Sequence, residues 1–293
     1  MEVNPSISAE FPYRSKFIDV LGSKIHYIDE GTGDVLLFVH GMPTSSYLWR
    51  NVIPWVCERN RCIALDLIGM GQSDKPDIPY RVFDFIRYFE GFVEALNLKN
   101  ITLVLHGYGS IIGFEYAKRH ENNLKSLVFF ESYIRHEMEL KMAALPMQHL
   151  IHMMQSDDLN ADKIINTNYF IDSIMPIGMM RKLTAKETDH YRSPFAQPEH
   201  RQLFWQYLQD LPIGKLAPND VVELITSYSK WLAESPLSKL MFYAIPGFNT
   251  TIDTINWARN HFKNLKLVDI GESLHFFQET HPDIIGQQIA DWL

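Results

Sequence analysis

The sequence predicts an α/β fold, in which a mostly parallel sheet of eight strands is flanked by helices and carries a helical insertion. Three observations support this. Short, continuous apolar runs alternate with helical patterns along most of the chain, which is typical of a parallel sheet covered on both faces. The interval 134–216 breaks this alternation. The chain has 293 residues, of which 46% are hydrophobic, enough to bury one large core.

The first two strands are expected to form a hairpin near residues 17–30. Apolar and polar residues alternate there around Gly22 and Ser23, which predicts an antiparallel pair. Later strands are apolar without interruption, as expected of strands buried on both faces. These runs lie at residues 35–41, 61–67, 101–107, 124–131, 239–247 and 265–271. Helical patterns fall between or after them, for example at 82–97, 110–120 and 282–293.

The inserted segment 134–216 is predicted to be a helical cap, and residues 1–133 and 217–293 are predicted to form the core domain. The segment has no convincing strand and holds eight of the twelve methionines of the chain. Methionine side chains fill irregular space adaptably, so the cap is expected to line a pliable, apolar pocket. The alternative is that these methionines occupy ordinary positions in the helix cores.

Composition and charge exclude several classes of function. The chain has 27 basic and 35 acidic residues, a net charge of −8, and no basic block, which argues against nucleic acid or anionic membranes as partners. No apolar run approaches the roughly 18 residues of a membrane helix. We expect a cytoplasmic protein that acts on a small molecule, with its oligomeric state open. Cys57 and Cys62 have no second pair or neighbouring histidine, so reduced thiols are expected, with no metal or cofactor.

The stretch LVLHGYGSIIGF, residues 103–114, has the pattern of a strand, a tight turn and a helix. Such an elbow often presents a catalytic nucleophile at its apex. Here the apex is Gly107, which has no side chain. The glycines of this stretch, with Glu131 further along, also resemble a dinucleotide fingerprint. The spacing differs from the usual one, however, and such a turn normally follows the first strand of its unit, so the elbow is the preferred interpretation.

Five motifs in a fixed order together resemble those of the α/β-hydrolase family, and in detail those of haloalkane dehalogenases and the Renilla-type coelenterazine luciferase. The resemblance extends from about residue 11 to residue 293. The motifs are HGMPTSSYLWR (40–50), DLIGMGQSDKP (66–76), HGYGSIIGF (106–114), YRSPF (191–195) and HFFQETHPDIIG (275–286).

The resemblance implies a role for each matched residue. In the dehalogenases an aspartate at the elbow attacks carbon and displaces halide, and a histidine, oriented by a carboxylate, then activates water against the resulting ester. The histidine matches His275, the carboxylate matches Glu131, and Gly107 is a vacant nucleophile position. The oxyanion hole of this fold would use the backbone N–H groups of Met42 and Tyr108.

The substrate pocket is expected to include the side chains of Met42 and Tyr108, and both depart from the family. Tyr108 stands where the family has a tryptophan that binds halide, and Met42 stands where many members have an asparagine. A thioether cannot donate a hydrogen bond to halide. Ser110 is not expected to replace the nucleophile, because a serine in the first helical turn commonly bonds to the backbone.

From these departures we expect a non-hydrolytic enzyme in which His275 and Glu131 act as a general acid/base pair on a small, apolar substrate. Cyclisation, elimination or rearrangement, as in a lyase or cyclase, would fit, and dehalogenation is not expected. One alternative is a haloalkane dehalogenase or related hydrolase inactivated by an Asp-to-Gly change. Another is a ligand-binding protein without catalysis.

Overall fold

The eight strands of the described chain form one sheet in the order β1-β2-β4-β3-β5-β6-β7-β8. The computed structural model describes residues 7–136, 140–214 and 217–293. The pairs β1/β2 and β2/β4 are antiparallel and all other neighbours are parallel, which confirms the predicted sheet. The strands are β1 (Lys16–Val20), β2 (Ser23–Glu30), β3 (Asp34–Val39), β4 (Asn60–Leu65), β5 (Ile101–His106), β6 (Leu124–Phe130), β7 (Ser238–Tyr243) and β8 (Leu265–Asp269).

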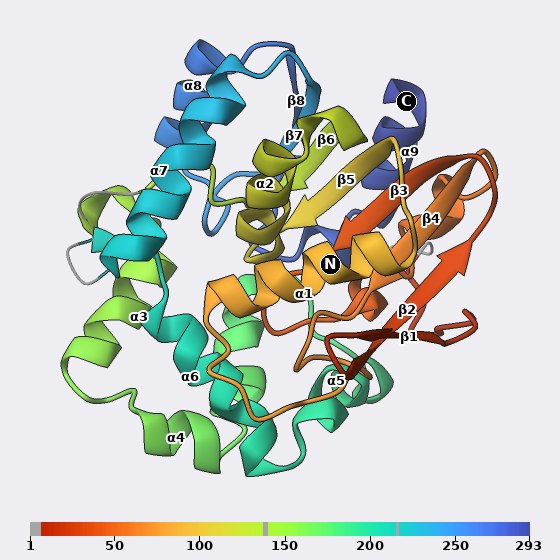
Figure 1. Cartoon of the computed structure of the whole chain (residues 1–293). Helices are drawn as coiled ribbons and strands as arrows, with labels where there is room; N and C mark the ends of the chain where they lie inside the picture. Colours follow the sequence, from red (N-terminus) through yellow and green to blue (C-terminus); the bar gives the residue numbers. More distant parts are fainter. Residues whose placement is uncertain (1–6, 137–139, 215–216) are drawn as a thin grey trace.

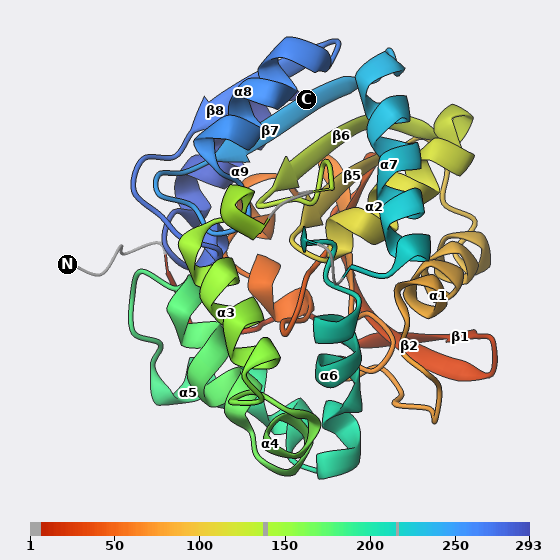
Figure 2. The same ribbon diagram turned by 90° about the vertical axis from the view of Figure 1, so that its left-hand side faces the viewer.

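Helices cover both faces of the sheet, as the apolar strands require. Figures 1 and 2 show α1 (Val82–Ala95), α2 (Gly109–Arg119) and α7 (Asn219–Glu234) on one face. The helix α8 (Ile252–His261) lies on that same face, since Phe262 at its end and Phe114 of α2 both contact Phe129 of β6, whereas α9 (Pro282–Trp292) lies on the other face. Every residue of β5, the strand that leads into the elbow, is buried between these layers. The elbow is therefore held by the most enclosed part of the sheet.

A group of shorter helices lies between β6 and α7 in the chain and forms a separate layer below the sheet in both views (Figures 1 and 2). Some of its helices begin at a capping residue; α5, for example, starts at a capping box in which Thr184 and Glu187 each bond to the other's backbone N–H. These helices are α3 (Leu145–Gln155), α4 (Ala161–Asn166), α5 (Ala185–Arg192) and α6 (Gln202–Gln209).

This layer, which we call the cap, falls within the predicted segment 134–216. The last two residues of that segment, 215–216, lie outside the described residues, and the division into a core and a cap domain stays a prediction. Within the described part of the chain, no helix is long and apolar enough to cross a membrane. Both cysteines carry free thiols.

Candidate active site

Gly107 lies at the turn between β5 and α2, with a φ of +52°. This left-handed conformation is easily adopted by glycine and is strained for most other residues. The next glycine is fixed by packing, since a Cβ atom on Gly109 would stand 2.3 Å from the carbonyl oxygen of His40. The glycine pattern of this stretch therefore serves the turn and the close contact of α2 with the sheet. These are structural reasons for the glycines that need no bound dinucleotide.

His275 lies directly over Gly107. A Cβ atom built on Gly107 would stand 3.0 Å from Nε2 of His275 and 3.1 Å from its Cε1. The backbone carbonyl of His275 contacts Nε2 of His106 at 3.0 Å, so the last residue of β5 supports the loop that carries His275. The sequence predicts His275 as the base that acts at the elbow, and in the structure its ring lies beside Gly107.

Glu131 follows β6 and is completely buried beside His275, with Oε2 3.2 Å from Nδ1 of the imidazole. The loop after β7 surrounds its carboxyl group: Phe248 N–H donates to Oε2 at 3.0 Å, and Thr250 N–H donates to Oε1 at 3.4 Å. The N–H of Asn249 also donates to Oε2. Glu131 is thus fixed by backbone donors, and its contact with His275 orients the ring.

Burial sets the protonation of this pair. It raises the pKa of Glu131 to about 8, against the opposing effect of the three backbone N–H donors. It lowers the pKa of His275 to about 3, because a charged imidazolium is poorly solvated there. The imidazole is therefore neutral near pH 7. When Glu131 is ionised and accepts a hydrogen bond from Nδ1–H, Nε2 is the nitrogen that can take a proton above Gly107.

The two predicted oxyanion donors lie on adjoining turns. A Cβ atom on Gly41 would stand 2.9 Å from the backbone nitrogen of Tyr108, which shows how closely the turn after β3 approaches the elbow. Among the described residues, the backbone N–H groups of Met42 and Tyr108 donate no hydrogen bond to the protein. Both donors are therefore available to a ligand, and their assignment as an oxyanion hole stays a prediction.

A small cavity of about 30 Å³ opens beside His275, between the sheet and the cap. Met42 lines it, as expected from the sequence, and Met147 and Met175 reach it from the cap. Most of its wall is apolar. The complete set of lining residues is Met42, Pro43, Met147, Leu150, Phe170, Ile174, Met175, Gly178, Tyr207, Phe248, Asn249, His275 and Phe276.

Tyr108 does not line this cavity. Its ring is buried edge-on against Phe85 and Tyr207, with centroids 5.5 Å and 5.1 Å away. Its hydroxyl has no hydrogen-bond partner among the described residues. Tyr207, from α6 of the cap, lies between Tyr108 and the cavity and supplies the phenol of the wall. Sequence reasoning missed Tyr207, because nothing in the local pattern of α6 indicates which turn of the helix faces the site.

Ser110 serves the backbone of the elbow. Its hydroxyl donates to the carbonyl oxygen of Gly107 at 2.6 Å and accepts the N–H of Tyr133 at 3.0 Å. It is completely buried, and both bonds tie it to main-chain groups. Ser110 is therefore already engaged, and the predicted site groups are the His275 and Glu131 pair and the two backbone donors. Within the described residues, no cluster of three or more histidine, cysteine or acidic side chains could hold a metal ion.

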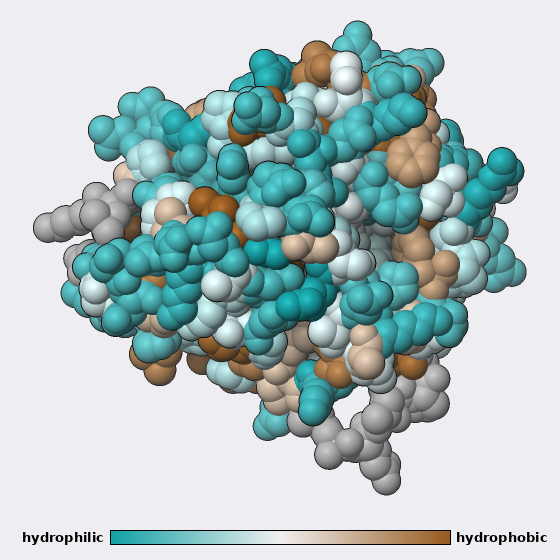
Figure 3. Space-filling view, turned by 90° about the horizontal axis from the view of Figure 1, so that it is seen from below, coloured by the Kyte–Doolittle hydropathy of each residue, from teal (hydrophilic) through white to brown (hydrophobic). Residues whose placement is uncertain are grey.

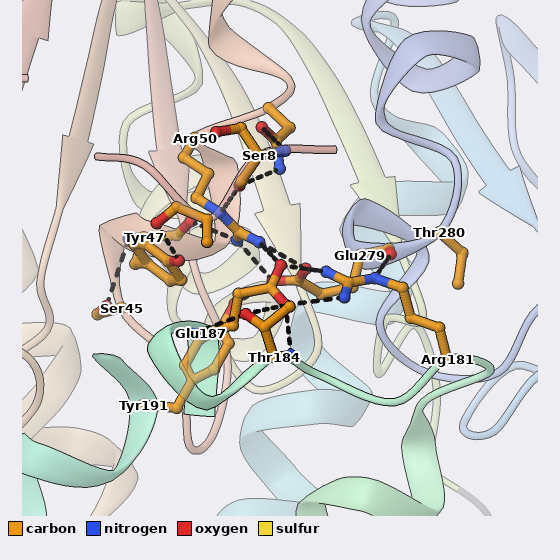
Figure 4. A network of polar contacts seen from close by, with 12 residues as sticks. Ser8, Ser45, Tyr47, Arg50, Arg181, Thr184, Glu187, Tyr191, Glu279 and Thr280 are labelled. Atoms are coloured by element: carbon orange, nitrogen blue, oxygen red, sulfur yellow. Dashed lines mark hydrogen bonds and ion pairs between the residues drawn. The ribbon is translucent and has the colours of Figure 1, made fainter. Parts of the chain in front are cut away.

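A buried network of charged residues holds the loop of His275 against the cap (Figure 4). Arg50 donates to Oε1 and Oε2 of Glu279, at 2.6 Å and 2.8 Å, and to Glu187 of α5 at 2.9 Å. Arg181 of the cap also contacts both Glu187 and Glu279. Near Arg181 in the cap, the backbone carbonyl of Gly178 accepts a hydrogen bond from the N–H of His275 at 2.9 Å.

This network was not recognised from the sequence, although two of its members lie in the quoted motifs. Arg50 ends SYLWR, and Glu279 lies in HFFQE, four residues after His275. A charged residue inside an otherwise apolar motif is the signal that could have indicated a buried ion pair. The two arginines and two glutamates balance in charge, so the network can stay buried.

Comparison with known proteins places this site in a family. The profile described as "alpha/beta hydrolase fold" matches residues 34–282. A haloalkane dehalogenase of Mesorhizobium japonicum is 34% identical over 99% of this chain and 94% of its own length. One from Sphingobium indicum is 38% identical over 94% of this chain and 93% of its own.

Solved structures agree with these matches. The crystal structure of haloalkane dehalogenase DbeA from Bradyrhizobium elkani has a TM-score of 0.91 and 32% identity, and covers 95% of this chain and 97% of that chain. Haloalkane dehalogenase DatA from Agrobacterium tumefaciens has a TM-score of 0.89 and 29% identity, with 95% of each chain covered. The likeness therefore includes the cap and the loops of the site as well as the sheet.

These matches correct the function expected from the sequence. The prediction that His275 and Glu131 serve a non-hydrolytic lyase or cyclase, with no dehalogenase activity, is wrong, because the relatives are named as haloalkane dehalogenases, which are hydrolytic enzymes. That prediction gave most weight to Gly107 and its neighbours, whereas the likeness extends over nearly the whole chain. The alternative of a dehalogenase-like hydrolase is favoured. The chain belongs to the alpha/beta hydrolase fold family and, within it, to the haloalkane dehalogenases.

Proposed function

We propose that this protein is a haloalkane-dehalogenase-like hydrolase of small, largely apolar halogenated compounds, in which the attacking carboxylate is replaced by Gly107. The observation that supports the proposal most directly is the position of His275. Its Nε2 atom lies 3.0 Å from the place where a Cβ atom of residue 107 would stand, and Glu131 holds the other nitrogen. This is the arrangement that a histidine needs to activate water against an ester formed on residue 107.

The hydrolytic cycle would use each remaining group. Gly107 supplies no attacking group, so the cycle is that of the chain with aspartate at position 107: a carboxylate oxygen of this aspartate attacks the carbon that carries the halogen, and halide leaves with the bonding electron pair. His275 then takes a proton from water at Nε2, and the hydroxide attacks the ester carbonyl. The N–H groups of Met42 and Tyr108 stabilise the oxyanion, and Glu131 stabilises the imidazolium. Release of the alcohol regenerates the carboxylate.

The substitution Gly107→Asp tests this proposal. We expect halide release from short chloro- and bromoalkanes to increase by roughly a thousand-fold or more over the Gly107 chain, because loss of a nucleophile from such a unit has effects of that order. Aspartate tolerates a positive φ better than most residues, and the ring of His275 needs to move by only a few tenths of an ångström to admit a Cβ atom. Halide release is measured both in the steady state and in single-turnover experiments.

Two variants sharpen the result. Gly107→Ala introduces the Cβ atom without a nucleophile and should release no additional halide. In Gly107→Asp with His275→Phe, the ester forms and is not hydrolysed, so halide release stops at one equivalent and the protein mass increases by the alkyl group. A folded Gly107→Asp protein that releases no halide from any compound of the panel would refute the proposal.

A further inference from the structure

Two hollows border one short segment of the cap, residues 170–178. The first is the cavity of about 30 Å³ beside His275. The second is a cleft of about 240 Å³ in the cap, lined mostly by apolar side chains that include Ile171 and Met179. Met175 lines both hollows and is buried. Its side chain therefore separates the cavity from the cleft.

The wall between the two hollows is thin. The segment begins as a π-helix and continues as a 3₁₀-helix. The residues that line the cavity are spaced four apart along it: Phe170, Ile174 and Gly178. Ile171, between them, lines only the cleft. Since the same segment lines both hollows, a single layer of side chains stands between them at Met175.

The backbone of this wall is held at both ends. The ring of Phe170 stacks on Phe204 of α6, with centroids 4.6 Å apart and the planes inclined by 16°. The carbonyl of Gly178 accepts the N–H groups of His275 at 2.9 Å and of Phe276 at 3.1 Å. Between these anchors, the unbranched side chain of Met175 has three rotatable bonds. It is the part of the wall best able to move.

The cavity alone is too small for a halogenated alkane. A water molecule needs roughly 10–15 Å³ of such volume, so a cavity of about 30 Å³ holds about two. Even a short chloroalkane therefore has to displace part of the wall. If the thioether of Met175 turns aside, the cavity and the cleft become one continuous, largely apolar channel.

We infer that the protein selects unbranched halogenated alkanes whose chain extends from His275 past Met175 into the cleft, and that Met175 determines this selectivity. Each methylene group that enters the cleft improves the dissociation constant by up to about fourfold, because apolar surface is removed from water. A short chain leaves the cleft empty. The inference rests on the proposed function for the reaction itself, in which water and the haloalkane give an alcohol, halide and a proton.

Binding to the chain as it stands tests the inference separately from turnover. Of the two hollows, Met42 lines only the cavity and Met179 lines only the cleft, so NMR signals of ¹³C-methyl methionine distinguish them. The probes are 1-chlorobutane and 1-chlorohexane. We expect 1-chlorohexane to shift both signals with one dissociation constant, at least fivefold lower than that of 1-chlorobutane.

A stiff ring at the wall should block the passage. In Met175→Phe we expect the preference for 1-chlorohexane, expressed as the ratio of the two dissociation constants, to fall at least threefold, and the Met179 signal to stop responding. In Met175→Ala, which leaves the passage open, both signals should still shift. The matched control is Met154→Phe, at a partly buried position of α3 that lines neither hollow, and its ratio should equal that of the unchanged chain.

Three results overturn the inference: a shift of Met42 by 1-chlorohexane without a shift of Met179, an unchanged ratio in a folded Met175→Phe protein, or no binding of either probe. The first and third need no variant, so they do not depend on how Met175→Phe folds. Halide release by Gly107→Asp without the paired shifts means that the inference fails alone. Paired shifts without halide release mean that the proposed function fails alone.

Discussion

At the scale of single residues, the protonation state of His275 follows from the groups that surround its ring. The ring is buried, its Nδ1 atom faces Glu131, and its Nε2 atom faces a residue that has no side chain. No carboxylate therefore stands on the Nε2 side to stabilise a positive charge. Burial dominates, and the pKa of His275 is lowered to about 3.

A carboxylate at position 107 should reverse part of this effect. In Gly107→Asp the negative charge favours the imidazolium, so the pKa of His275 should rise by about 1 to 3 pH units, the size expected for an opposite charge a few ångströms away. The measurement is an NMR titration of isotope-labelled histidines, with the His275 signal assigned from His275→Gln. The signal of His261, which is exposed on α8, serves as the internal control and should not differ between the two proteins. Identical His275 titration curves in the two proteins would contradict this prediction.

The contact between His275 and Glu131 could be predicted because both residues match known motifs. The direction of the Tyr108 side chain could not be predicted in this way. His275 and Glu131 are 144 positions apart and meet at 3.2 Å because each follows a strand whose carboxyl end lies at the same sheet edge. Tyr108 sits next to Gly107 in the sequence, yet its ring points away from the cavity, toward Phe85. The direction of a side chain at a helix start depends on tertiary packing, which a sequence pattern does not contain.

At the scale of elements, the charged network acts as a clamp between the cap and the loop of His275. The side chains of Arg50 and Glu279 are fully buried, and Tyr191 of α5 also bonds to Glu279. Each charge has its partner in place, so the cost of burying it is offset only while the whole set is intact. The cap is therefore fastened to the site through a few specific bonds in addition to apolar packing.

Breaking one member should show this dependence. Glu279→Gln leaves Arg50 and Arg181 to share Glu187 as their counter-charge, so one buried positive charge is uncompensated, and we expect the free energy of unfolding to fall by about 3 to 5 kcal/mol. The control is Asp172→Asn, which breaks the exposed cap pair with Arg192, where the two atoms are 2.9 Å apart. That change should cost less than about 1 kcal/mol. Both are measured by urea unfolding, and similar losses in the two variants would rule out the clamp.

The elements themselves differed in how well the sequence predicted them. The limits of strands such as β5 and β6 are predicted to within a residue, because short apolar runs bounded by turns leave little choice of where each strand begins and ends. The cap was predicted only as a helical region. Its helices are short, and the segment Phe170–Ile174 is a π-helix, so no regular spacing of apolar residues marks their limits.

At the scale of the whole molecule, charge and surface indicate which ligands can reach the cavity. The chain carries a net charge of −8, and the face seen from below, where the cap lies, is mostly hydrophilic (Figure 3). No lysine or arginine lines the cavity itself. The neighbouring cleft of about 240 Å³ in the cap includes Arg181 and Lys182, but Arg181 is already paired with Glu187 and Glu279. An anionic ligand in the cavity beside His275 would thus lose its hydration without gaining a counter-charge.

We therefore expect neutral halogenated compounds to bind in preference to halogenated carboxylates of the same length. For the chain as it stands, 4-chlorobutyrate should bind at least about tenfold more weakly than 4-chlorobutan-1-ol at pH 7, because transferring an unpaired carboxylate into an apolar cavity costs several kcal/mol. A measurement at high salt distinguishes long-range repulsion by the net charge from the cost of desolvating the carboxylate. In roughly 1 M salt the Debye length falls to about 3 Å, which removes long-range repulsion by the net charge and leaves the desolvation cost. Most of the preference should persist in ligand-observed NMR titrations at that salt concentration; equal affinities at low salt would show that a cation does reach the cavity.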